Sequence, residues 1–322
     1  MGGLVSKQSS FDPSTDIPDL TGKVSIVTGG NAGLGYATVQ HLARHGAKVY
    51  IAARSEERAK AAIERLHAER LHPGNGQLDW LVLNLSDPAQ AKAAAEAFLQ
   101  KESSMRIPYN IDSKYGIHEN MLQCSHVSPF VFTNALMPLL ARTAREPDSD
   151  VRIVMVSSHM IKTLKGRDIH FRDVNDFNEK FGNHIYSDMH RYALSKLANI
   201  LFAKELQARL DVQDLHIIVL SITPGSVNTE GIYKDPSLKL PVIGPLLKLI
   251  FPRIFLSPTE GAYTSVFAAA SPVVRAERDR YKGAYLEPPG KLAIPPAPQA
   301  ESKKLAEELW NTTEAIVKTF DL

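Results

Sequence analysis

A glycine-rich turn near the start of the chain constrains its fold most strongly. Residues 23–28 are a short apolar run typical of a strand, the turn Thr28-Gly-Gly-Asn-Ala-Gly-Leu-Gly35 follows, and a helix pattern extends to His45. Glycines let the backbone turn tightly and approach an anion without obstruction by Cβ atoms, and the start of a helix supplies N–H donors. The turn therefore predicts a pyrophosphate site, although its G-x-x-x-G-x-G spacing is not the familiar G-x-G-x-x-G. An ordinary glycine-rich strand–helix turn is the alternative.

Strand and helix patterns alternate along the rest of the chain, which predicts a mostly parallel, doubly wound α/β sheet with helices on both faces. Further strands are expected at 48–53, 78–85, 151–156, 215–222 and 281–286, and helices at 55–71, 87–101, 120–140, 191–210, 260–270 and 302–319. A chain of 322 residues that is 44% hydrophobic can build one large core. We therefore predict a disordered tail over residues 1–20 and a single Rossmann-like domain over residues 21–322.

One buried strand that such a sheet needs is not evident between residues 102 and 116. Only Met105–Ile111 is apolar there, and Pro108 lies in its middle. Proline cannot donate a hydrogen bond to a strand ladder, so this segment is a poor central strand. We therefore expect the sheet to lack one central strand. A lost coding segment, through a splice form or an imperfect gene model, is a better explanation than divergence.

A second motif, Tyr192-Ala-Leu-Ser-Lys196, lies in a strong helix pattern. Residues four apart share one face of a helix, so the two side chains are neighbours. A neighbouring ammonium favours the phenolate, which allows the Tyr192 hydroxyl to act as a general acid or base. An isolated Y-x-x-x-K is more often surface chemistry, but Ser158 ends a strand just upstream and the glycine turn stands in the right order. Together these residues predict hydride transfer with a nicotinamide cofactor.

The end of the second strand bears on the choice of cofactor. It reads Ile51-Ala-Ala-Arg-Ser55, with no acid where an NAD site usually binds the ribose hydroxyls. The guanidinium of Arg54 suits a 2′-phosphate. This favours NADP over NAD, and a solvated arginine at a helix start is the alternative reading.

Four segments jointly resemble the short-chain dehydrogenase/reductase family: the turn 28–35, Val156-Ser-Ser158, Tyr192-Ala-Leu-Ser-Lys196 and Pro224-Gly-Ser-Val-Asn-Thr229. The long stretch between Ser158 and Tyr192 is similar to the retinol-dehydrogenase-like and WW-domain-oxidoreductase-like branch. The resemblance implies reversible oxidation of an alcohol, or reduction of a carbonyl, on a lipophilic small molecule. It implies that Tyr192 donates or accepts the proton. Lys196 would bind the nicotinamide ribose and stabilise the phenolate of Tyr192, and Ser158 would donate a hydrogen bond to the substrate oxygen. The implied cofactor contacts are Thr28, Gly29, Asn31, Gly33, Leu34, Gly35, Arg54, Asn84, Tyr192, Lys196, Pro224, Gly225, Val227 and Thr229.

Three departures from the family pattern support a rival hypothesis. The fourth strand with its Asn-Ala-Gly motif is not evident, Asn84 stands where the family usually has Asp, and Ser125 stands where an Asn usually completes the catalytic set. A serine hydroxyl is shorter and does not offer the same path for a proton to Lys196. The rival is a non-catalytic truncated pseudoenzyme or splice form with at most a cofactor-binding or regulatory role.

Composition argues against several other classes of protein. The net charge is +2 with acids and bases interspersed, and no basic stripe suggests nucleic acid. The single cysteine, Cys124, cannot form an intrachain disulfide, which favours a reducing, cytoplasmic setting. The histidines at 159, 170, 184 and 190 match no zinc spacing, so we expect no metal.

Two segments suggest contact with a membrane, and two predicted helices suggest a dimer. The start, Met1-Gly2-Gly3-Leu4-Val5-Ser6, fits N-myristoylation at Gly2, with a plain polar tail as the alternative. The apolar, proline-interrupted segment 240–256 suits a lid over an apolar substrate, with peripheral membrane contact as the second reading. Apolar stripes on the helices at 120–140 and 191–210 are read as core packing, and in the family they often pair subunits into a homodimer.

Overall fold

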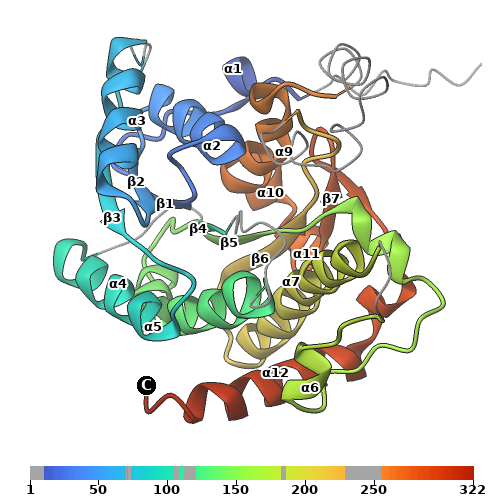
Figure 1. Ribbon diagram of the computed structural model, residues 1–322. Coiled ribbons are helices and arrows are strands. Elements are labelled where there is room, and N and C mark those ends of the chain that lie inside the picture. Colours follow the sequence, from blue (N-terminus) through green and yellow to red (C-terminus); the bar gives the residue numbers. More distant parts are fainter. Residues whose placement is uncertain are drawn as a thin grey trace, which may run out of the picture.

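The computed structural model describes residues 11–69, 71, 74–103, 109–111, 121–182, 186–228 and 255–322. Among these residues, eight strands form one sheet in the order β3-β2-β1-β4-β5-β6-β7-β8 (Figure 1). Neighbouring strands are parallel except β7 and β8, which are antiparallel. The strands are β1 (Val24–Thr28), β2 (Lys48–Ala53), β3 (Leu78–Val82), β4 (Tyr109–Ile111), β5 (Val151–Val156), β6 (Ile217–Ile222), β7 (Tyr285–Glu287) and β8 (Lys291–Ala293). The predicted doubly wound parallel sheet is confirmed.

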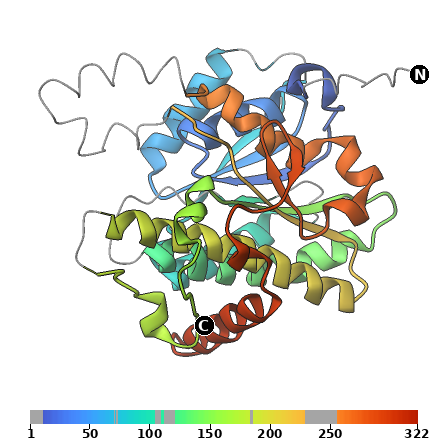
Figure 2. The same cartoon turned by 90° about the vertical axis from the view of Figure 1, so that its right-hand side faces the viewer.

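Helices cover both faces of the sheet. One face carries α2 (Gly33–Arg44), α3 (Glu56–Ala68) and α9 (Pro258–Ala270), and the other carries α4 (Pro88–Lys101), α5 (Ser128–Ala144) and α7 (Ser187–Val212) (Figure 1). The C-terminal helix α12 (Lys303–Lys318) lies outside α7 (Figure 2). Shorter helical elements are α1 (Pro13–Asp16), η1 (Gln123–Val127, a π-helix), η2 (His159–Leu164, a 3-10 helix), α6 (Val174–Phe177), α10 (Pro272–Ala276), α11 (Arg278–Tyr281) and η5 (Pro298–Glu301, a 3-10 helix).

Local chemistry explains why these elements begin where they do. All six residues of β5 are buried, as expected for a central strand covered on both faces. The Ser55 side chain accepts a hydrogen bond from the Arg58 N–H at the start of α3, and Asp87 does the same for Ala89 at the start of α4. Such N-caps satisfy helix donors that have no partner within the helix.

The prediction that the sheet lacks its fourth strand is corrected by β4. Val27 of β1 pairs with Asn110, and Tyr109, Asn110 and Ile111 pair with residues 153–155 of β5, so a strand stands between β1 and β5. It is formed by the C-terminal end of the apolar segment 105–111, directly after Pro108 in the sequence. The three paired residues come after Pro108 in the sequence, and each of them has a backbone N–H. The strand has three residues, against six in β5.

The first twenty residues include packed structure. Residues 1–10 lie outside the described part of the chain, but residues 11–20 contain α1 and bury Pro13, Ile17 and Leu20. The Phe11 ring contacts the edge of the Phe267 ring at 5.1 Å between centroids. Residues 11–20 are therefore not part of a disordered tail, because their apolar side chains complete the cores beside α2 and α9.

Candidate active site

The predicted site residues follow strands whose carboxyl ends share one edge of the sheet. Thr28 ends β1, Ser158 comes two residues after the end of β5, and Pro224 comes two residues after the end of β6. In open parallel sheets this edge is where ligands bind. The fold therefore brings Thr28 to the same edge as Ser158 and Pro224, which follow it by more than a hundred residues in the sequence.

The glycine turn has the backbone geometry that its sequence suggests. Gly29 and Gly33 have φ angles of 64° and 53°, in the left-handed region that side chains disfavour. A Cβ atom at Gly35 would lie 2.4 Å from the Gly29 carbonyl oxygen, so a side chain there would displace the turn. Helix α2 begins at Gly33, and its N-cap, Ala32, has no side-chain oxygen to bind the first N–H groups. The turn therefore fits a pyrophosphate at the N-terminus of α2.

Other residues of the turn contribute through the backbone or through packing. Thr28 and Leu34 are buried, and Leu34 packs in the apolar cluster beneath α9. Asn31 is half-buried in the turn. Leu34 therefore has only main-chain groups to offer a ligand.

Tyr192 and Lys196 share one face of α7, as predicted. The Lys196 side chain is 2% exposed, and its Nζ lies 5.7 Å from the centre of the Tyr192 ring. The same ammonium donates a hydrogen bond to the Val156 carbonyl oxygen at 3.2 Å. A buried ammonium needs such an acceptor, because burial without one is costly.

The two serines after β5 have different partners. The Ser157 hydroxyl donates to the Lys196 carbonyl oxygen at 2.8 Å, which ties the end of β5 to α7. Ser158 is half-buried, and its Oγ accepts a hydrogen bond from the Met160 N–H at 3.2 Å. This contact uses a lone pair of Ser158, so its hydroxyl hydrogen can still be donated to a ligand oxygen.

Arg54 and Asn84, two of the implied cofactor contacts, lie after β2 and β3. Arg54 is exposed and directly precedes the N-cap of α3. The Asn84 amide oxygen accepts from the N–H and the hydroxyl of Ser86 at 3.2 and 2.8 Å, and its amide nitrogen donates to Gln90 at 3.1 Å. The amide oxygen and nitrogen of Asn84, which the prediction makes available to the cofactor, thus make hydrogen bonds within the turn before α4.

The loop after β6 completes the candidate site. Gly225 has a φ angle of 77°, and a Cβ atom there would lie 3.0 Å from the Pro288 ring. Val227 forms an isolated parallel bridge with Leu256. Pro224 is half-buried, and Thr229 lies outside the described residues.

Sequence reasoning missed two features next to these residues, namely the π-helix that carries Ser125 and the amide of Asn199. Ser125 is 2% exposed and lies in the π-helix η1, which packs against α7. Single π-turns are rare and frequently occur at functional sites. The second feature is Asn199, a fully buried amide on α7 that also binds the Val156 carbonyl. The sequence position of Asn199, three residues after Lys196, predicts that the two side chains share one face of the helix. This spacing is the signal that could have identified Asn199 as a candidate site residue.

The histidines of the polar insert are dispersed. His159 pairs with Glu287 of β7 at 3.5 Å, His170 pairs with Asp168 at 3.0 Å, and the Arg167 guanidinium lies 3.3 Å from His190 Nε2. His184 lies outside the described residues. Within the described ranges, no group of three or more His, Cys, Asp or Glu side chains could hold a metal ion. In that same part of the chain, no helix combines the length and the apolar character needed to cross a bilayer.

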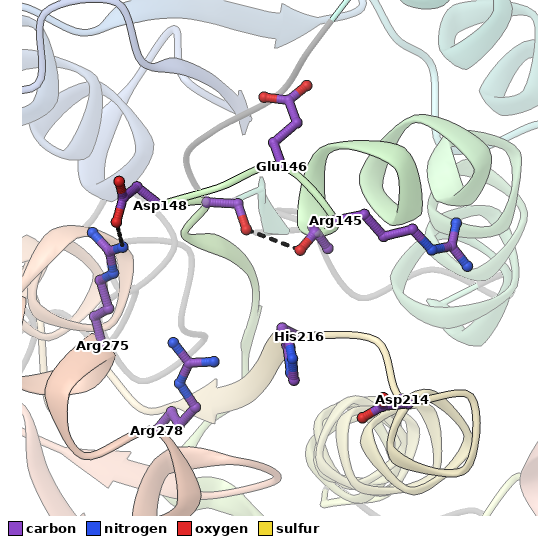
Figure 3. Close-up of a pocket in the computed structure, with 9 residues that line it drawn as sticks. Arg145, Glu146, Asp148, Asp214, His216, Arg275 and Arg278 are labelled. Carbon is purple, nitrogen blue, oxygen red and sulfur yellow. Dashed lines mark hydrogen bonds and ion pairs between the residues drawn. The ribbon is translucent and has the colours of Figure 1, made fainter.

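A polar concavity lies at the opposite edge of the sheet, near the beginnings of β5 and β6 (Figure 3). Its charged side chains carry both signs, and Arg275 pairs with Asp148 across it at 3.4 Å. None of the predicted site residues lines it. This concavity and the predicted site residues therefore lie at different edges of the sheet.

Comparison with known proteins places these observations in a family. Residues 23–165 match the model of the short chain dehydrogenase family. The short chain dehydrogenase/reductase dpchH of Colletotrichum higginsianum is 41% identical over 95% of this chain and 77% of its own length. A short-chain dehydrogenase/reductase of Armillaria gallica is 38% identical over 98% of this chain and 99% of its own length.

Solved structures share the fold at lower identity. An uncharacterized protein of Mycobacterium paratuberculosis is 22% identical with a TM-score of 0.68, over 96% of this chain and 98% of that one. RhlG of Pseudomonas aeruginosa, solved in complex with NADP, is 23% identical with a TM-score of 0.61, over 84% of this chain and 96% of that one. With relatives this similar along nearly its whole length, the chain belongs to the short-chain dehydrogenase/reductase family of oxidoreductases.

Proposed function

We propose that this protein is an NADP-dependent oxidoreductase that interconverts an alcohol and a carbonyl on a lipophilic small molecule. The observation that carries the proposal is the position of the buried Lys196 ammonium, 5.7 Å from the centre of the Tyr192 ring at the edge of the sheet that carries Ser158. The glycine turn, which fits a pyrophosphate, lies at the same edge.

Each polar side chain has a distinct task in this proposal. In the direction of reduction, the Tyr192 hydroxyl gives its proton to the substrate oxygen, and the Lys196 ammonium stabilises the phenolate that remains. The Ser158 hydroxyl donates a hydrogen bond to the same substrate oxygen and orients it. The bound nicotinamide cofactor supplies or accepts the hydride. In oxidation the phenolate takes the proton back from the alcohol.

The choice of NADP is supported by Arg54. It is exposed at the end of β2, where an arginine can meet a 2′-phosphate. The residues of β2 before it supply no carboxylate for ribose hydroxyls. The lipophilic substrate is supported by the apolar sequence 240–256, of which residues 240–254 lie outside the described part of the chain.

We also propose a homodimer, peripheral membrane contact and a cytoplasmic location. A homodimer through α5 and α7 has to use the surface that α12 leaves uncovered, because the Trp310 ring stacks on Phe202 of α7 and meets Phe130 of α5 edge-on. Peripheral membrane contact and myristoylation at Gly2 stay predictions from the sequence, since Gly2 lies outside the described residues. A cytoplasmic location likewise stays a prediction.

The test is Tyr192→Phe, which removes the hydroxyl and keeps the ring. We expect NADPH-dependent carbonyl reduction to fall by about 100-fold or more, with the dissociation constant of NADPH little changed in a fluorescence titration. The matched control is Tyr186→Phe, a tyrosine that directly precedes the same helix and is 58% exposed, which should keep full activity. Undiminished turnover of Tyr192→Phe would refute the catalytic assignment.

The rival pseudoenzyme hypothesis is favoured by the three-residue β4 and by Ser125. If such a pseudoenzyme keeps a cofactor-binding role, NADPH raises its melting temperature, because a ligand that binds only the native state stabilises it. The rival hypothesis also predicts no reduction of any member of a panel of lipophilic aldehydes and ketones by the full chain.

A further inference from the structure

Two side chains of α7 converge on one backbone oxygen at the end of β5. The Lys196 Nζ lies 3.2 Å from the Val156 carbonyl oxygen, and the Asn199 Nδ2 lies 3.0 Å from it. Asn199 is fully buried, and Lys196 is 2% exposed. Residues three apart lie on one face of a helix, so α7 presents both donors to the same acceptor.

The strand geometry explains why the Val156 carbonyl accepts from Lys196 and Asn199 and does not pair with β6. The Ser157 N–H donates to Ile222 of β6, and alternate residues of a strand direct their backbone groups to opposite neighbours. The Val156 carbonyl therefore points to the β4 side. The described β4 ends at Ile111, whose partner Met155 comes one residue before Val156. The carbonyl thus lies at the end of the ladder.

The orientation of the Asn199 amide is fixed by the same contact. With the amide turned over, two acceptor oxygens would lie 3.0 Å apart, which is repulsive. The Asn199 Oδ1 is buried and has no hydrogen-bond partner among the described residues. Buried polar groups are nearly always paired, so an exception in a native core calls for an explanation.

We propose that Asn199 is a positioning residue of the active site, which holds the Val156 carbonyl in the place where it anchors the Lys196 ammonium beside Tyr192. This inference rests on the proposed function. An ammonium has three hydrogens, and only one is used by Val156. With the carbonyl held by Asn199, the other two have a fixed direction toward the Tyr192 oxygen and a ligand hydroxyl. Without Asn199 the carbonyl can tilt, and the ammonium moves with it.

The test is Asn199→Leu, which keeps the branching and the number of side-chain heavy atoms and removes the donor. We expect kcat to fall about tenfold, with the KM for the carbonyl substrate within about twofold, because the change acts on proton transfer. The pH at which kcat for alcohol oxidation is half-maximal should rise by about one unit, since a displaced ammonium stabilises the phenolate less.

A second readout needs neither cofactor nor substrate. The phenolate absorbance of the free protein is titrated with pH, and the contribution of Tyr192 is obtained by subtracting the curve of Tyr192→Phe. The midpoint of this difference curve, which reports the free protein, should also rise in Asn199→Leu. Asn199→Ala, which removes the donor with less bulk, gives the same test if the leucine variant does not fold.

The matched control is Gln207→Leu. Gln207 is 3% exposed on the same helix, and its amide also binds backbone, accepting from the Val219 N–H at 2.7 Å and donating to the Ile217 carbonyl at 3.1 Å. It should lower the melting temperature and leave both midpoints unchanged. The proposal is overturned if the Asn199 variants behave like Gln207→Leu. Failure of the proposed function has a different signature, since either the wild type would reduce no carbonyl or Tyr192→Phe would retain full turnover.

Discussion

The Nε2 atom of His126 lies 2.8 Å from the Thr313 hydroxyl oxygen, and the contact joins the π-helix η1 to the C-terminal helix α12. The Thr313 hydroxyl already donates to the Leu309 carbonyl at 2.6 Å, so it can only accept from His126. The Nε2 atom therefore carries a hydrogen, and burial, which lowers the pKa of His126, keeps the imidazole neutral. Its Nδ1 is buried with no hydrogen-bond partner among the described residues.

Stability should depend on pH through this histidine. Burial lowers the pKa of His126 from 6.5 to about 3. Below pH 6.5 the imidazole is therefore protonated in the unfolded chain and stays neutral in the folded chain. The contribution of His126 to the free energy of unfolding is complete above pH 6.5 and is lost as pH falls toward 3. Denaturant unfolding should show a loss of about 2 kcal/mol from this group between about pH 8 and about pH 5.

The control for this pH dependence is His126→Gln, which keeps an N–H donor for Thr313 and cannot titrate. The variant should lose about 2 kcal/mol less than the wild type over the same pH range, because the other acid-sensitive groups are shared. One of these is His41, whose pKa is lowered to about 4, mainly by burial. Parallel pH curves for the two proteins would contradict the assignment.

A buried arginine in β5 should matter for stability far more than a surface one. Arg152 is 1% exposed, binds both Asp150 carboxylate oxygens at 2.8 and 2.6 Å, and donates to the Ala268 and Ser271 carbonyls at the end of α9. Arg152→Leu leaves a partly buried carboxylate and two carbonyls without this donor, so urea unfolding should show a loss of about 3–5 kcal/mol. Arg275→Leu, which breaks an exposed pair with Asp148, should cost about 1 kcal/mol or less.

The proposed preference for NADP makes Arg54 selective between cofactors. Arg54→Ala should weaken NADPH binding by about 10- to 100-fold in a fluorescence titration and leave NADH binding within about twofold, because only NADPH carries the 2′-phosphate. Lys60→Ala is the control, since that lysine is exposed on α3 and pairs with Glu56. Equal losses for both cofactors would rule out a 2′-phosphate contact.

The glycine turn should not tolerate a methyl group at Gly35. In Gly35→Ala the new Cβ would lie 2.4 Å from the Gly29 carbonyl oxygen and 2.8 Å from its carbon, so the turn must move away from the start of α2. NADPH affinity should fall by about tenfold or more, since the backbone donors lose their alignment. Gly22→Ala meets no atom within 4 Å and has a φ angle of 77°, so it should cost about 1–2 kcal/mol of stability without affecting NADPH.

Much of the fold could be predicted because the decisive signals are local. The predicted strands at 48–53 and 151–156 coincide with β2 and β5, and the helices predicted to start at residues 55 and 87 are α3 and α4, which begin directly after the N-caps Ser55 and Asp87. The helical repeat alone places Tyr192 and Lys196 on one face of α7. The family resemblance is confirmed by relatives that match nearly the whole chain, whereas its retinol-dehydrogenase-like branch stays a prediction.

The sequence by itself therefore determined the order of the elements, the bounds of most helices and the residues of the glycine turn, since caps, periodicity and backbone permissiveness act over a few residues. Only the tertiary structure decided that residues 109–111 stand in the sheet as β4, because a short strand is formed by pairing with its neighbours and not by its own propensity. The same holds for the meeting of Lys196 and Asn199 at the Val156 carbonyl. That contact depends on which backbone group lies at the end of the β5 ladder and on the helix packed above it.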